Sequence, residues 1–353
     1  MLIKEILEKI VDLGASDIFL VAGIPLTYKL KGTMYHYSED KLKPEDTFNY
    51  LNEIYELAGN RKRQLYDKKG DDDFSFSIVN CSRFRVSAYK QRGSDSAVIR
   101  VITFSLPDHK ELGIPESVID LTKMTKGLIL VTGPAGSGKS TTQACLIDKI
   151  NRECQKHIIT LEDPLEYLHR HKKSIVSQRE ISSDTESYLT ALRAALRQSP
   201  DVILLGEMRD YETMSVAMTA AETGHLIIST LHTIGAANTI DRILDSFPPS
   251  QQHQIAIQLS MVLRAVVSQQ LLPTVDGKIL PAFEIMTLTP AIRNMIRENK
   301  IHQIDSAIQT SQDKQMITMD NSILTLYKEG KITGATALRN ASNPEMMEKK
   351  IKL

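Results

Sequence analysis

Residues 127–142 read GLILVTGPAGSGKSTT, an apolar run followed by a glycine-rich loop that ends in Gly-Lys-Ser. The loop has the spacing G-x-x-x-x-G-K-[ST], which wraps backbone N–H groups around a phosphate at the start of a helix. The apolar run before it is typical of a buried strand, and residues 141–150 supply the helix that must follow. The context therefore predicts a strand, a phosphate loop and a helix that together bind a nucleoside triphosphate.

The residue types of the loop fit the two expected cofactors, ATP and Mg²⁺. Its glycines let the backbone wrap the phosphates without Cβ clashes. Lys139 can reach the β- and γ-phosphates as a point charge, and the Ser140 hydroxyl is placed to bind Mg²⁺. The predicted ATP-binding residues of this segment are Gly133, Pro134, Ala135, Gly136, Ser137, Gly138, Lys139, Ser140 and Thr141.

The composition is that of an ordinary globular protein. A chain of 353 residues suggests two domains, because single cores seldom exceed about 250–300 residues. Lys and Arg equal Asp and Glu at 43 each, which argues against dedicated nucleic-acid binding. The three cysteines have no C-x-x-C spacing and fit a reducing compartment. With no secretory signal and no spanning apolar run, we expect a cytoplasmic protein that reaches a membrane only through partners.

The first 105 residues are predicted to form a small mixed α/β domain on an antiparallel sheet. Apolar residues spaced as on one helix face run through residues 3–11, and residues 44–57 form a second expected helix. Alternation of apolar and polar side chains predicts half-buried strands. These strands cover residues 16–21, 28–35, 74–78 and 84–88.

Residues 106–115 contain two prolines and a glycine and predict a linker. Residues 116–353 follow a different pattern, in which short apolar strands alternate with helices. Strands of this kind are buried on both faces, which is typical of the parallel sheet of a nucleotide-binding domain. From about residue 249 we expect a helical C-terminal part, with Leu263 and Val266 on apolar helix faces.

Polar residues follow three of the predicted parallel strands at the point where each strand ends. Ligands bind beyond the carboxyl ends of such strands, so these positions should line the nucleotide site. Glu162 follows the first strand, Glu207 the second and His232 the third. Hydrolysis needs one carboxylate for the attacking water and another for the magnesium shell. We therefore predict Glu162, Glu207 and His232 as the catalytic residues.

The neighbours of the two glutamates suggest separate roles for them. A strand of this kind usually ends in an acidic residue that directs the metal, and Gly206 takes that place here. We therefore assign Glu207 to Mg²⁺, through water, and Glu162 to the attacking water, while His232 senses the γ-phosphate. The residues alone also allow the opposite assignment of the two glutamates.

Several arginines are candidates to stabilise the transferred phosphoryl group. Phosphoryl transfer gains about 10³–10⁵ in rate from an arginine that a neighbouring subunit supplies. Arg193 and Arg197 share one predicted helix, whereas Arg85, Arg92 and Arg100 lie on or beside the last strands of the first domain. The sequence alone does not choose among them.

Motifs in a fixed order run through almost the whole chain. They are GASDIFLVAGIPLTYKLKG (14–32), RFRVSAYKQRG (83–93), the phosphate loop, ITLEDPLEYLH (159–169), SQRE (177–180), ALRAALRQSPDVILLGEMRD (191–210), TGHLIISTLHTIGAANTIDRI (223–243) and AIRNMIRE (291–298). In this order they resemble the type IV pilus retraction ATPases (the PilT family) of the hexameric secretion ATPases. Ala135, Ser199 and Met295 depart from the family's pattern, but none of these changes removes a catalytic group.

The resemblance implies an α/β architecture with a small PAS-like α+β domain over residues 1–105 and a RecA-like P-loop ATPase domain over residues 116–353. It implies a homohexameric ring in which Arg85 and Arg100 reach nucleotide, and it supports the roles given to the two glutamates and to His232. The implied function is ATP-driven retraction of type IV pili, which powers twitching motility. The implied partners are the inner-membrane pilus platform protein and a paralogous accessory retraction ATPase, with no nucleic acid.

Three other functions compete with retraction. A pilus-assembly or secretion ATPase would be related, but such proteins resemble one another in an extra N-terminal domain and usually a four-cysteine zinc motif, and no C-x-x-C is present. An accessory coupling subunit with little hydrolysis of its own would share the motifs, although the intact catalytic residues count against it. A DNA-translocating motor needs a basic channel, which the neutral charge does not favour. Retraction is therefore the expected function.

Overall fold

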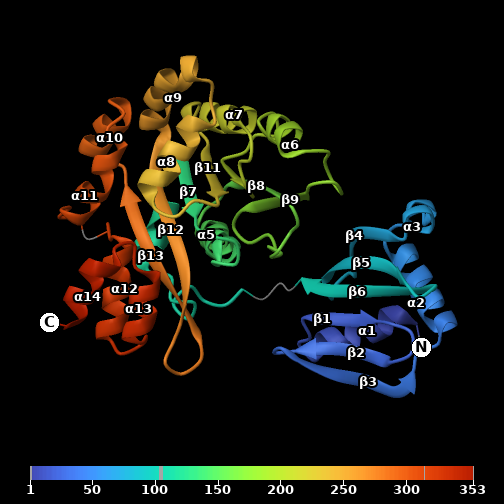
Figure 1. Ribbon diagram of the computed structural model, residues 1–353. Coiled ribbons are helices and arrows are strands. Elements are labelled where there is room, and N and C mark those ends of the chain that lie inside the picture. Colours follow the sequence, from blue (N-terminus) through green and yellow to red (C-terminus); the bar gives the residue numbers. More distant parts are fainter. Residues whose placement is uncertain (1, 103–105, 314, 353) are drawn as a thin grey trace. The chain divides into compact units, whose positions relative to one another are not determined.

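The computed structural model describes residues 2–102, 106–313 and 315–352, which form two compact units (Figure 1). The first unit is a six-stranded antiparallel sheet in the order β3-β2-β1-β6-β5-β4, with three helices. Its elements are α1 (Ile3–Asp12), β1 (Asp17–Leu20), β2 (Pro25–Leu30), β3 (Thr33–Lys41), α2 (Pro44–Leu57), α3 (Gln64–Lys69), β4 (Asp71–Ser77), β5 (Arg83–Gln91) and β6 (Ser94–Ile102).

The core of the first unit follows from the two periodicities in its sequence. Ile6 and Leu7 on α1 and Leu51 on α2 are buried against alternate residues of the sheet, such as Phe84 and Val86 on β5. Because successive strand side chains point to opposite faces, one face of this sheet packs beneath the helices and the other carries polar residues. The expected amphipathic helices and alternating strands are therefore present.

One predicted strand of the first unit is in fact a hairpin. Residues 28–35 were expected to form a single strand, but the chain turns at Lys31 and Gly32, which join β2 to β3. Both residues have left-handed backbone angles, with φ of 48° and 87°. Two successive positive φ angles are typical of the tight turn that matches the twist of an antiparallel pair. Apolar and polar side chains alternate in the strands on both sides of such a turn, so the pattern does not reveal where the chain changes direction.

The second unit is built on a seven-stranded sheet in the order β13-β12-β7-β11-β10-β8-β9, in which only β13 runs antiparallel to its neighbour. Its strands are β7 (Gly127–Thr132), β8 (His157–Glu162), β9 (Ile175–Glu180), β10 (Val202–Leu205), β11 (Leu226–Leu231), β12 (Leu263–Pro273) and β13 (Ile279–Thr287). Its helices are α4 (Glu116–Ile119), α5 (Lys139–Glu153), α6 (Tyr188–Ala195), α7 (Tyr211–Glu222), α8 (Ala236–Asp245), α9 (Pro249–Val262), α10 (Pro290–Arg297), α11 (Ile304–Gln309), α12 (Met319–Lys328), α13 (Gly334–Asn340) and α14 (Pro344–Lys352), with short 3₁₀ turns at Asp120–Lys123 and Ile301–Gln303.

Strand β7 is covered on both faces, as a central parallel strand requires. Leu128 and Leu130 pack into a core shared with helices α6 to α11, whereas Ile129 and Val131 pack on the opposite side with α4 and α5. All four side chains are fully buried. The sheet is therefore the middle layer of three, and its parallel strands all end at the edge where the phosphate loop begins.

The C-terminal part is helical except for a long hairpin that the sequence analysis missed. Helix α9 ends at Val262, and residues 263–287 form β12 and β13, with β12 pairing parallel to β7. Leu263 and Val266, which were expected on helix faces, therefore lie in a strand. An apolar run buried on both faces fits a helix or a strand equally well from spacing alone, and here pairing with β7 decides for the strand. Helices α12 to α14 pack together against this hairpin.

Candidate active site

The phosphate loop leaves β7 and opens α5, as the sequence predicts. Gly133 and Gly138 have φ of 140° and 87°, in the region that favours glycine. A Cβ on Gly133 would lie 2.2 Å from the carbonyl oxygen of Gln269 on β12, so the loop backbone passes directly against that strand. The buried Ser137 hydroxyl has no hydrogen-bond partner among the described residues, which suits a loop that receives phosphate oxygens.

Lys139 is the first residue of α5, and its side chain folds back over the loop. Its Nζ donates to the carbonyl oxygens of Gly133 at 3.0 Å and Pro134 at 2.9 Å. The residue is 9% exposed, and Nζ lies 3.5 Å from Nδ1 of His232. The ammonium group is therefore held at the mouth of the loop, where it can contact a phosphate.

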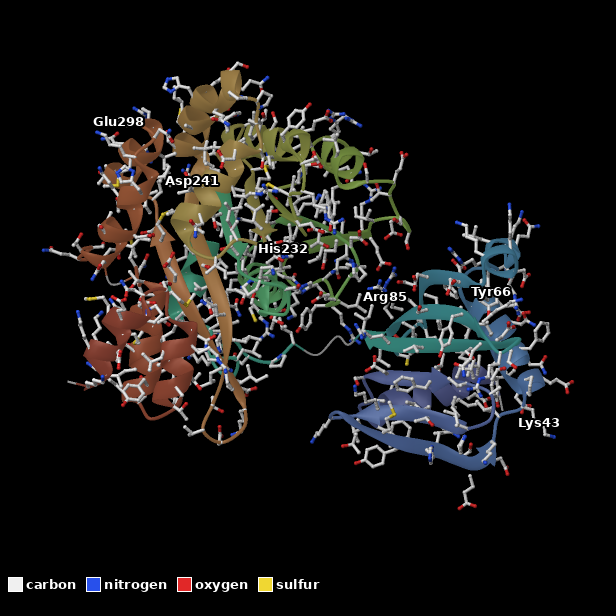
Figure 2. All side chains as sticks on the ribbon, viewed as in Figure 1. Lys43, Tyr66, Arg85, His232, Asp241 and Glu298 are labelled. Carbon is white, nitrogen blue, oxygen red and sulfur yellow. The ribbon has the colours of Figure 1, made fainter. Side chains whose placement is uncertain are left out.

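Glu207 and His232 meet beyond the ends of β10 and β11 (Figure 2 labels His232). One carboxylate oxygen of Glu207 lies 2.5 Å from Nη2 of Arg209, and the other lies 3.4 Å from Nε2 of His232. Burial opposes ionisation of this carboxyl group, but hydrogen bonds and charge from Arg209 and then His232 outweigh it and lower the pKa of Glu207. The arrangement keeps Glu207 ionised. The His232 ring lies between Glu207 and Lys139, with one ring nitrogen facing each of them.

Glu162 is the last residue of β8, one position beyond the point where β8 and β10 stop pairing. Its Oε1 accepts a hydrogen bond of 3.3 Å from the side-chain amide of Gln178 on the adjacent strand β9. Gln178 in turn accepts the backbone N–H of His169 at 2.7 Å through its own oxygen. The orientation of the Gln178 amide is therefore set from both ends, and this amide in turn orients the Glu162 carboxylate.

Gly206 stands at the position where an acidic residue was expected to direct the metal, and the structure shows why a side chain does not fit there. A Cβ on Gly206 would meet the hydroxyl oxygen of Tyr188 at 2.8 Å and the carbonyl oxygen of Leu161 at 3.2 Å. Burial, followed by the charges of Glu207 and Asp163, raises the pKa of Tyr188, so this hydroxyl is neutral.

We expect Gly206→Asp to lower the free energy of unfolding by about 1–3 kcal/mol, because the new side chain must displace the Tyr188 hydroxyl from a packed site. Urea denaturation of the purified chain measures this change. In a Tyr188→Phe background the hydroxyl is gone, so the same substitution should cost less. An equal loss in both backgrounds would contradict the steric explanation.

The predicted arginines occupy separate places. Arg85 on β5 and Arg100 on β6 lie directly opposite each other in the first unit, where Nε of Arg100 is 3.2 Å from Oδ1 of Asp17 (Figure 2 labels Arg85). Arg193 lies on α6, and Arg197 follows that helix and donates to the Arg193 carbonyl oxygen. The structure thus brings Lys139, Glu207 and His232 together in the second unit. In the first unit, Arg85 and Arg100 occupy opposite positions on the adjacent strands β5 and β6.

Sequence reasoning missed Gln269 on β12, which supports the phosphate loop. Its side-chain oxygen accepts the Thr142 hydroxyl of α5 at 2.7 Å, and its amide nitrogen lies 2.9 Å from the position of a Cβ on Gly138. Gln269 is 3% exposed. No local pattern marks such a residue, because its partners are more than a hundred positions away and the strand that carries it was expected to be a helix.

The fold and the site together define a P-loop ATPase. The model of the family described as Type II/IV secretion system protein matches residues 1–279, and the chain belongs to this family. It is 42% identical over 343 residues to the type IV pilus retraction ATPase PilT of Pseudomonas aeruginosa, covering 97% of this chain and 99% of that protein. It is 44% identical over 320 residues to a twitching motility protein of Neisseria gonorrhoeae, covering 90% and 85% of the two chains.

A solved structure supports the same classification. The crystal structure of the pilus retraction motor PilT with bound ADP matches with a TM-score of 0.89 and 46% identity, over 99% of both chains. The expected family, the α/β architecture and the class of enzyme are therefore confirmed. In the described ranges, no helix combines the length and the apolar character needed to cross a membrane.

Proposed function

We propose that this chain is a motor that hydrolyses ATP to retract type IV pili and so drives twitching motility. The observation that carries the proposal is the extent of the similarity to the Pseudomonas PilT ATPase, which spans 97% of this chain and 99% of that protein. Lys139, Glu162, Glu207 and His232 are all present, and they lie at the edge of the sheet where nucleotide binds in such folds.

The residues of the site fit ATP and Mg²⁺. The loop from Gly133 to Thr141 would hold the phosphates, with Lys139 on the β- and γ-phosphates. Ser140 and, through water, Glu207 would hold Mg²⁺, which neutralises charge on the phosphates. In the part of the chain that the structure describes, no three His, Cys, Asp or Glu side chains cluster as a metal site. That is compatible with Mg²⁺, which keeps several waters and phosphate oxygens in its shell.

The side chains divide the reaction among them in this proposal. Glu162, oriented by Gln178, accepts a proton from the water that attacks the γ-phosphorus, while the bond to the leaving ADP oxygen breaks. Lys139 stabilises the charge that develops on the phosphoryl oxygens. His232 contacts both Lys139 and Glu207, so it is placed to respond to the γ-phosphate.

The assembly follows from the same proposal. The motor is a homohexamer, in which a first domain of residues 1–105 and an ATPase domain of residues 116–353 move about the linker at 106–115. Arg85 and Arg100 would complete the nucleotide site of a neighbouring subunit. The ring works at the inner face of the cytoplasmic membrane on the pilus platform protein, together with a paralogous accessory ATPase.

Deletion of the gene tests the cellular function. We expect cells that carry more surface pili than the parent and that no longer retract them, because assembly continues without its opposing motor. Electron microscopy of surface pili measures this, and restoring the wild-type gene is the control. Loss of pili on deletion would indicate an assembly ATPase instead, and a purified protein with negligible ATPase activity would indicate an accessory coupling subunit.

A further inference from the structure

The β12–β13 hairpin contacts the loops of the nucleotide site on one strand and the C-terminal helices on the other. Ser268 on β12 lies directly opposite Glu284 on β13, and Gln269 lies opposite Phe283. The Ser268 hydroxyl accepts the backbone N–H of Gly235 at 2.9 Å, and Gln269 supports the phosphate loop. These two pairs therefore form one continuous strip of sheet beside the site.

Within this strip, Glu284 contacts both the nucleotide-site side, at α8, and the C-terminal side, at α12. Its Oε1 accepts the backbone N–H of Ala236 at 2.8 Å. Ala236 is the first residue of α8 and lies four positions after His232, at the end of the His232 loop (residues 232–235). Its Oε2 accepts the N–H of Met319 at 3.3 Å, at the start of α12. Glu284 is 8% exposed, so one buried carboxylate binds the first turns of two helices. The positive ends of both helices compensate its charge.

Residues on either side of Glu284 also join β13 to the segment that begins α12. The backbone N–H of Phe283 donates to the Ser322 hydroxyl on α12 at 3.0 Å, and Ile285 pairs with Ile317 in an isolated bridge just before that helix. Helix α12 and the residue pair just before it are thus attached to three successive residues of β13, Phe283, Glu284 and Ile285. A displacement of α12 must therefore displace Glu284 or break its hydrogen bonds.

The two helices depend on Glu284 to different degrees. Helix α12 has its own N-cap, because the Thr318 side chain accepts the N–H of Asn321 at 3.3 Å. The N-cap residue of α8 is Gly235, which has no side chain to offer. An N-terminus without a local cap is left with unsatisfied N–H groups, and Glu284 accepts one of them, the N–H of Ala236. Capping alone would explain a contact to α8, but it does not require the second contact to α12.

We propose that Glu284 is a positioning residue that couples the seating of α12 to the placement of the His232 loop, so that the C-terminal helices control the rate of ATP hydrolysis. This inference rests on the proposed hydrolysis of ATP at that site. Burial raises the pKa of Glu284, whereas the hydrogen bonds from Ala236 and Met319 act to lower it. The two hydrogen bonds of Glu284, to the first residue of α8 and to the first residue of α12, therefore carry the proposed coupling.

Steady-state ATPase kinetics of the full chain test the proposal. Glutamine keeps the size of residue 284 but offers a single oxygen, so Glu284→Gln retains one of the two hydrogen bonds and turns an N–H donor toward the other. We expect kcat to fall about tenfold or more with KM changed less than about twofold, because a small misplacement near the reacting groups impairs the chemical step more than binding.

Thr318→Ala is the matched control. It removes the local cap of α12, but it leaves the hydrogen bonds from Met319 to Glu284 and from Phe283 to Ser322, so the helix stays seated on β13. We expect its kcat to remain within about twofold of the wild type. If Glu284→Gln does not fold, Glu284→Asp keeps the charge but shortens the reach, so it should lower kcat in the same way. An equal loss of kcat in Thr318→Ala, or wild-type kcat in the Glu284 variants, would overturn the proposal.

Hydrogen exchange gives a readout that does not depend on turnover. In the wild type, adding ADP should change the exchange of amides in residues 319–322 as well as in the phosphate loop, since linkage between two sites is reciprocal. In Glu284→Gln the phosphate loop should still respond and residues 319–322 should not. The same response of α12 in both proteins would refute the coupling. A wild-type chain that neither binds nor hydrolyses nucleotide would instead refute the proposed function itself.

Discussion

Lys139→Ala is expected to reduce ATP hydrolysis by at least about a thousandfold, to the background of the assay. The wild-type ammonium group is buried at the mouth of the loop, where it contacts two loop carbonyl oxygens and approaches His232. Alanine removes the charge that would meet the β- and γ-phosphates and leaves nothing to replace it. Phosphate release by the purified chain and equilibrium binding of a fluorescent ATP analogue measure the two consequences separately, and both should be lost.

Lys149→Ala is a suitable control for this prediction. Lys149 lies on the same helix, α5, and its half-buried side chain pairs with the exposed Glu153 at 2.7 Å. An ion pair at the surface of a helix contributes little, so hydrolysis should stay within about twofold of the wild type. Thermal unfolding of both variants checks that the helix remains folded. Wild-type turnover in Lys139→Ala would overturn the assignment of the phosphate loop as the nucleotide site.

Glu162→Gln should reduce hydrolysis by about 10²–10⁴-fold while nucleotide binding remains close to that of the wild type. Glutamine has nearly the same shape and can still contact the Gln178 amide through its oxygen, but it cannot take a proton from the attacking water. The loss should therefore appear in kcat. Single-turnover hydrolysis, measured with enzyme in excess over ATP and at saturating Mg²⁺, isolates the chemical step.

A magnesium titration decides between the two possible assignments of the glutamates. Glu207 is ionised and paired with Arg209 and His232, which suits a group that holds a metal shell through water. Glu207→Gln should therefore raise the Mg²⁺ concentration needed for half-maximal activity, whereas Glu162→Gln should not. The reverse pattern, with Glu207→Gln inactive at saturating Mg²⁺ and Glu162→Gln merely needing more of it, would exchange the two roles.

Local signals were sufficient for the parts of the site that are contiguous in the chain. The phosphate loop is predictable because glycine spacing and a preceding apolar strand leave few other conformations for that segment. Glu162, Glu207 and His232 are predictable because parallel strands end at a common edge, so residues after different strands gather there. The structure brings His232 and Glu207 within 3.4 Å, which agrees with that reasoning.

The residues that support the site were not predictable in the same way. Leu263 and Val266 were expected on a helix. A segment buried on both faces has no apolar period that distinguishes a strand from a helix. That error concealed the hairpin and with it Gln269 and Glu284, whose hydrogen bonds join residues 127 and 48 positions apart. The hairpin at Lys31 was missed for a related reason, since alternation does not reveal where a strand reverses.

By itself, the sequence determined the class of ligand and the family, and it predicted the candidate catalytic residues, because each depends on short patterns whose conformations are constrained locally. Only the tertiary structure decided what holds those residues in place. Glycine at position 206 leaves room for the Tyr188 hydroxyl, and Glu284 joins the starts of α8 and α12. These relations depend on which strands become neighbours in the sheet, and strand order is set by packing over the whole unit rather than by any one segment.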